Sequence, residues 1–208
     1  MDVTDVTDLI DLIDLPESFP RLNVPDARLP RRRLLQGLGV AAALPWLAAC
    51  QPSQPAVNFN GTDLTGADYA KDFSLPDTEG QLRSLKDYAG KVVVMFFGYT
   101  QCPDVCPTTM TELAGAKQML GKAGNRVQGL FVTVDPVRDS AAVLKEYTAN
   151  FDTSFVALRP ADQAALDRLA SDFKIHFKNV PGSAPDQYTV DHTAASFVYD
   201  DTGRLRLY

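Results

Sequence analysis

Cys102 and Cys106 are the residues of this chain best suited to chemistry, because only three residues separate them and both thiols can reach one metal ion or form one disulfide. Two thiolates joined by one imidazole make a soft set of few ligands, which suits Cu(I), whereas structural zinc sites usually close with four ligands. A disulfide across so short a gap restricts the unfolded chain only slightly, so stability is a poor reason for the pair. The spacing therefore favours a metal site or a redox dithiol.

The two thiols lie where an expected strand gives way to an expected helix. The apolar, β-branched run over 91–97 is typical of a buried strand, and Leu113 and Leu120 recur at helical spacing within 107–123. Pro107 is tolerated only near the start of that helix, because proline donates no backbone hydrogen bond. A helix N-terminus carries partial positive charge, so we expect it to lower the pKa of these thiols.

Strands alternate with helices along the rest of the chain, which indicates βαβ units, a parallel sheet and an α/β fold. We expect these elements: a hairpin at 72–85, a strand at 127–134, a helix at 140–151, a strand at 155–158, a helix at 161–173, a loop at 177–187, and a closing hairpin at 194–208.

This order of elements, with a dithiol after the first central strand, resembles the thioredoxin fold. Three motifs in their order and spacing resemble the SCO/SenC family: Gly98-Tyr-Thr-Gln-Cys-Pro-Asp-Val-Cys-Pro107, Asp135-Pro-Val-Arg-Asp139 and Asp191-His192. The resemblance covers about residues 68–208 and implies a thioredoxin-like fold with an N-terminal β-hairpin. Family members normally continue into a C-terminal helix that is absent from this sequence, so we expect apolar surface to be exposed there.

The resemblance also implies a ligand set and a function. Cys102, Cys106 and His192 would hold copper, as Cu(I) or Cu(II), for delivery to the binuclear copper centre of cytochrome c oxidase. His192 stands just before the closing hairpin, whose first strand should lie beside the strand that carries the dithiol; the alternative is a turn histidine bonded to backbone. His176 alternates with apolar neighbours and lacks a motif, so we expect it to face solvent.

Three carboxylates could support the site. Asp135 and Asp139 follow the second central strand at the edge of the sheet where ligand sites gather, and the resemblance favours a role facing the site or a partner for Asp135. Asp139 could face the site, or it or Ser140 could cap the following helix. Asp191 could accept a hydrogen bond from the neighbouring imidazole or simply end a turn.

The N-terminal quarter carries export features rather than a fold. Arg31-Arg-Arg33, an apolar run and small residues before Cys50 indicate a lipoprotein-type signal peptide over 30–50, with Cys50 as the lipidated residue. The apolar run is shorter than the ~20 residues of a membrane span, and Sec and Tat export both remain open. We interpret 1–29 as a non-native or disordered extension and 51–67 as a flexible tether to a domain over 68–208.

These features predict an exported protein anchored to the outer face of the bacterial cytoplasmic membrane. Its partners would be the copper-receiving subunit of cytochrome c oxidase or another copper chaperone. The formal net charge of −6 offers no basic surface for nucleic acid. The rival function is a thiol-disulfide oxidoreductase that keeps the recipient's cysteines reduced; a peroxiredoxin-like peroxidase is disfavoured, because Pro103 replaces the threonine expected three residues before Cys106.

Overall fold

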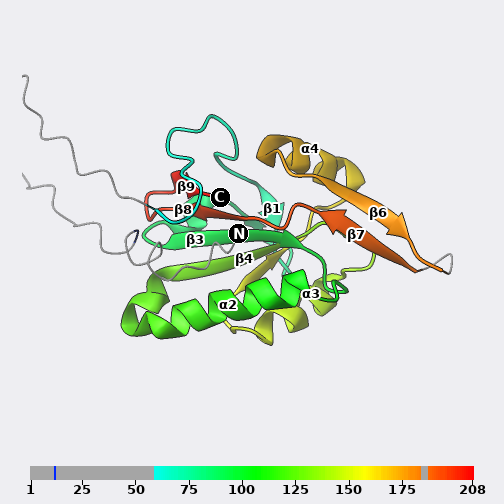
Figure 1. The fold of residues 1–208 in the computed structure, drawn as a ribbon, viewed down its shortest axis with the longest axis horizontal. Coiled ribbons are helices and arrows are strands. Elements are labelled where there is room, and N and C mark those ends of the chain that lie inside the picture. Colours follow the sequence, from blue (N-terminus) through cyan, green and yellow to red (C-terminus); the bar gives the residue numbers. More distant parts are fainter. Residues whose placement is uncertain (1–11, 13–58, 184–186) are drawn as a thin grey trace, which may run out of the picture. The chain divides into compact units, whose positions relative to one another are not determined.

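A five-stranded mixed sheet forms the centre of the fold (Figure 1). Its spatial order is β5-β4-β3-β8-β9, in which β3, β4 and β5 run parallel while β8 and β9 pair antiparallel. The strands are β3 (Val92–Gly98), β4 (Val127–Thr133), β5 (Val156–Leu158), β8 (Ser196–Tyr199) and β9 (Leu205–Leu207). This arrangement confirms the predicted α/β class and places β8, which follows His192, beside β3, which leads to the cysteines.

Three α-helices cover this sheet: α2 (Val105–Met119), α3 (Ala141–Ala149) and α4 (Gln163–Phe173). Helices α2 and α3 lie on one side and α4 on the other, as Figure 1 shows. Alternate strand residues face opposite sides, so Phe97 packs its ring 5.2 Å from that of Phe173 on α4, whereas Phe131 packs 5.1 Å from Tyr147 on α3. Both faces of the central strands are therefore buried, as their unbroken apolar runs predict.

The computed structural model describes residues 12, 59–183 and 187–208. The chain divides into one unit of residues 1–15 and 59–208 and another of residues 16–58, which lies outside the described part. The predicted signal peptide with Cys50, residues 51–58 of the tether and all of the predicted extension except residue 12 also fall outside it and remain predictions. Within the described ranges, no helix combines the length and apolarity that crossing a membrane requires.

The predicted loop over 177–187 is wrong. The chain there forms an antiparallel hairpin of β6 (Phe177–Pro181) and β7 (Tyr188–His192), in which Phe177 pairs with His192. Pro181 suggested a loop, but it is the last residue of its strand, a position where proline is tolerated. This β6–β7 hairpin is a separate two-stranded sheet, and His192 is the residue that ends it.

The predicted N-terminal hairpin is present but short, with β1 (Leu75–Pro76) paired to β2 (Leu82–Arg83). The fold also begins before residue 68, because Thr62 donates to the carbonyl of Tyr208 and Leu64 to that of Arg206. The last residues of the predicted tether therefore lie along β9 and do not hang free.

The expected exposure of apolar surface at the C-terminal strands is also wrong. Leu205 and Leu207 are buried, and Phe59 and Leu64 pack against the same core. Residues upstream of 68 therefore supply apolar cover close to β9.

Candidate metal centre

The two cysteines lie at the corner between β3 and α2. The backbone N–H of Cys102 donates to the carbonyl of Tyr99, which turns the chain, and α2 then begins at Val105, two residues earlier than predicted. Pro107 falls in the first turn, where a backbone N–H has no partner within the helix, so its missing donor costs nothing. Both thiols are free; Cys106 is completely buried, while Cys102 is only partly buried.

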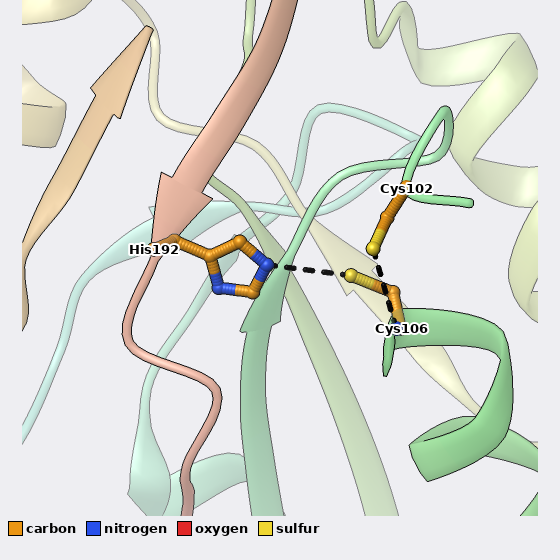
Figure 2. A group of neighbouring side chains, drawn as sticks. All are labelled: Cys102, Cys106 and His192. Atoms are coloured by element: carbon orange, nitrogen blue, oxygen red, sulfur yellow. Dashed lines mark hydrogen bonds between the residues drawn. The ribbon is translucent and has the colours of Figure 1, made fainter. Parts of the chain in front are cut away.

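His192 reaches this corner from 86 residues further along the chain. Figure 2 shows its imidazole pointing at Cys106, with 3.5 Å between Nε2 and Sγ, while the N–H of Cys106 lies 3.4 Å from the sulfur of Cys102. One ligand atom from each of the three residues lies within 4.8 Å of the others. The structure thus brings together the three side chains that the sequence singled out, in a cluster small enough for one metal ion.

The hydrogen bonds of His192 orient its free lone pair toward the sulfurs. Nδ1 lies 3.1 Å from the carbonyl oxygen of Thr193, which can only accept, so Nδ1 carries the proton and Nε2 is free to accept or to bind a metal. Burial lowers the pKa of His192, opposed by the Thr193 carbonyl and the charge of Asp191. The neutral imidazole that a metal requires is therefore the favoured form.

Burial raises the pKa of the Cys106 thiol, and a hydrogen bond involving Cys102 adds to the effect. For Cys106, the expectation of a thiol activated by the helix N-terminus is therefore wrong. The dipole of the helix stabilises a thiolate by a modest amount, whereas removing the whole group from water disfavours the charged form more strongly. In the metal-free site Cys106 is therefore a thiol, and its sulfur lies 3.5 Å from the acceptor Nε2 of His192.

Gly98 gives Cys106 its space, a role that the sequence analysis did not assign. A Cβ at this last position of β3 would lie 2.8 Å from the Cys106 sulfur, 2.9 Å from the ring of Phe96 and 3.0 Å from that of Phe131. A glycine that ends an otherwise apolar strand was the available signal, because such a residue often marks a close approach.

The three carboxylates have structural partners. Asp135 is buried and accepts from Tyr188 and Arg138, so it does not face a partner protein. Asp139 is buried as well and does not cap α3, since Ser140 is the N-cap. Asp191 is exposed and acts on His192 through its charge, because the Thr193 carbonyl takes the Nδ1 hydrogen bond.

His176 lies outside the cluster, as predicted. It is exposed, and its backbone N–H and carbonyl bond to the side chain and the backbone N–H of Thr193. These bonds fix the chain immediately after His192, so the segment around His176 contributes to the site through its backbone.

Comparisons with known proteins agree with this geometry. The SCO1/SenC family model matches residues 61–208. A SCO2-like protein of Rickettsia felis is 29% identical over 168 residues, which are 80% of this chain and 82% of that relative. Copper-bound ScoI of Bradyrhizobium japonicum is 37% identical with a TM-score of 0.59, over 64% of this chain and 84% of that chain. Apo Sco1 of Thermus thermophilus is 39% identical with a TM-score of 0.60, over 72% and 86%. These matches confirm the predicted thioredoxin-like fold. The chain belongs to the SCO1/SenC family.

Proposed function

We propose that this protein is a copper metallochaperone that carries its ion on Cys102, Cys106 and His192. The observation that carries the proposal is the convergence of two sulfurs and one unprotonated imidazole nitrogen within 4.8 Å. Such a soft set suits Cu(I), and neutral imidazole also suits Cu(II). The copper-bound relative from Bradyrhizobium japonicum supports the choice of metal.

Delivery would proceed by ligand exchange, with copper as the cargo. Cys102 is the more accessible of the two thiols, so a thiolate of the recipient displaces it first, and the buried Cys106 leaves last. The displaced Cys106 thiolate takes up a proton and His192 leaves as the neutral imidazole, while copper keeps its oxidation state, so the transfer needs no external oxidant or reductant.

We further propose that the recipient is the copper-receiving subunit of cytochrome c oxidase or another copper chaperone. Lipidation at Cys50 would tether the domain to the outer face of the cytoplasmic membrane. Both statements rest on the motifs and the signal-like segment of the sequence. Electrophoretic mobility and mass of the mature protein, in wild type and in Cys50→Ala, would test the lipid anchor.

The second candidate function is thiol-disulfide exchange, favoured by two free cysteines whose groups lie in contact. Cys102 would attack a disulfide of the recipient and form a mixed disulfide, and Cys106 would then displace the second recipient thiol. The recipient gains two electrons and the chaperone ends as the Cys102–Cys106 disulfide. His192 is dispensable in this reaction.

Copper titration with a competing chelator separates the two functions. Wild type should retain one equivalent of Cu(I), and Cys102→Ser, Cys106→Ser and His192→Ala should each lose most of it. The control His176→Ala removes an exposed imidazole outside the cluster and should bind like wild type. Retention of one tightly bound equivalent by all three site variants would rule out this site. An oxidoreductase, in contrast, keeps its dithiol exchange rate in His192→Ala.

A further inference from the structure

One short turn touches both halves of the metal centre. The turn joins β4 to α3 over residues 134–140, and we call it the β4–α3 turn. It contributes Arg138 toward the β6–β7 hairpin, which carries His192, and Asp139 toward the corner that carries the cysteines. These two adjacent residues have different partners, so each half of the site has its own anchor.

The anchor of the hairpin is Arg138. Its guanidinium forms an ion pair with Asp135, donates to the carbonyl of Tyr188 at 2.8 Å, and stacks with its carbon 3.5 Å from the centre of the Tyr188 ring. The hydroxyl of Tyr188 closes the group by donating to Asp135 at 2.9 Å. Tyr188 is the first residue of β7 and His192 is the last, so the clamp and the ligand share one short strand.

The hairpin needs such an anchor because the central sheet does not hold it. It forms its own two-stranded sheet, β6 is almost entirely exposed, and Val190 is the only buried residue of β7. An isolated two-stranded hairpin is only marginally stable in water. A metal ligand, in contrast, has to be held within about 0.5 Å of its working position. The Thr193–His176 bonds fix one end of the hairpin strands, and the Arg138 clamp fixes the other.

The anchor of the cysteine corner is Asp139. Its buried carboxylate accepts from the hydroxyl of Thr100 at 2.6 Å and from the backbone N–H of Thr100 at 3.2 Å. The hydroxyl of Thr133, the last residue of β4, donates to the same carboxylate at 2.6 Å. Thr100 lies two residues before Cys102, so Asp139 ties the start of the corner to the end of the neighbouring strand.

We propose that the β4–α3 turn positions the two halves of the metal centre separately: Arg138 is the positioning residue for His192, and Asp139 is the positioning residue for the dithiol. The proposal rests on the proposed function, because it concerns the same three ligands. Contacts also cross between the halves: Arg138 donates to the side chain of Gln101 at 3.1 Å and lies 5.6 Å from the centre of the Tyr99 ring, and that ring meets His192 edge-on at 5.8 Å. Gln101 is exposed, so this bond competes with water and contributes little to either anchor.

Hydrogen exchange of the metal-free protein, resolved by segment, tests the separation. Arg138→Gln should speed exchange of the amides of 188–192 about tenfold or more and change those of 100–108 far less, because it removes charged hydrogen bonds from the hairpin and, from the corner, only the exposed bond to Gln101. Thr100→Val should do the opposite, since it removes one hydroxyl donor to Asp139. Gln101→Ala is the control and should match wild type in both segments.

Two further variants keep the test decisive. Arg138→Lys restores the charge beside Asp135 but not the planar fork, so it should rescue the hairpin only partly. If Arg138→Gln does not fold, Tyr188→Phe removes only the bond to Asp135 and should speed hairpin exchange by a smaller factor. The proposal would be overturned if Arg138→Gln, or Tyr188→Phe in its place, speeds hydrogen exchange equally in both segments or in neither segment.

Copper adds a spectroscopic readout. Arg138→Gln loaded with Cu(II) should lose or weaken the nitrogen hyperfine splitting that His192 gives to wild type, whereas Thr100→Val should keep it. If wild type and His192→Ala give the same spectrum, the proposed metal function is wrong, whereas the hydrogen-exchange data still test whether Arg138 and Asp139 anchor their two segments. If only His192→Ala changes the spectrum, the function stands and the positioning role of Arg138 fails.

Discussion

Gly98→Ala should damage the metal centre although it replaces none of the three ligands. The added methyl would lie 2.8 Å from the Cys106 sulfur and 2.9–3.0 Å from two aromatic rings, where ordinary contacts begin at 3.4 Å. All three neighbours belong to buried residues, so none can swing into solvent. Overpacking of this kind costs about 1–3 kcal/mol, and relief requires the Cys106 sulfur or the two rings to leave their positions. We therefore expect lower stability together with weaker copper binding.

Gly115→Ala is the matched control for this variant. Gly115 lies within α2, and a Cβ there would meet nothing within 4 Å. Alanine in a helix is better than glycine by about 0.5–1 kcal/mol, so this variant should be more stable than wild type and bind copper normally. Urea unfolding gives the free energies, and competition with a Cu(I) chelator gives the affinities. A Gly98→Ala protein with wild-type stability and affinity would refute the argument that Cys106 fills that space.

Three other outcomes follow from burial and charge. Because burial raises the pKa of Cys106, copper must displace its proton, so this thiol alone should contribute about a tenfold rise in apparent Cu(I) affinity per pH unit between pH 6 and 8; chelator competition should show a shallower pH dependence in Cys106→Ala. Iodoacetamide should label Cys102 before the fully buried Cys106, as peptide mass spectrometry would show; the reverse order would contradict the assigned exposure. Burial alone would raise the pKa of Asp200, but hydrogen bonds from Thr202 and Arg204 lower it below its ordinary value. Its contribution to stability is therefore present above the unfolded pKa of ~3.9 and is lost as the pH falls through the lower folded value. Asp200→Asn should lower the free energy of unfolding by about 2 kcal/mol at pH 7 and by much less near pH 2.5, as urea unfolding would show.

The central sheet was predictable because its signal is local. The apolar runs over 91–97 and 127–134 predicted β3 and β4 to within about one residue at each end, since strands buried on both faces need unbroken apolar sequence. The β6–β7 hairpin gave no such signal. It is largely exposed and contains Pro181, so neither apolar alternation nor strand propensity distinguished it from a loop.

The site was predictable in its composition and not in its electrostatics. Spacing and topology together predicted the three ligands: two cysteines lie in one turn, and one histidine lies just before a strand that pairs with β3. The pKa of Cys106 depends on how completely the surrounding residues bury its sulfur, so only the packed fold shows that burial outweighs the helix dipole. Arg138 was missed because the sequence analysis considered only the carboxylates of its motif, while its partner Tyr188 lies 50 residues away.

The unequal burial of the two sulfurs gives copper transfer a direction. In the metal-free site the Cys106 sulfur lies 3.5 Å from Nε2 of His192, so these two ligands are in contact before a metal arrives. Cys102 is the accessible group, so an incoming ion meets it first and then takes Cys106 and His192 as the proton leaves. In the proposed function, release also begins at Cys102, which a thiolate of the recipient can reach, and it ends when the proton returns to the buried Cys106. If the protein carries copper as we propose, this contact between thiol and imidazole would favour the empty site and so favour release of the ion.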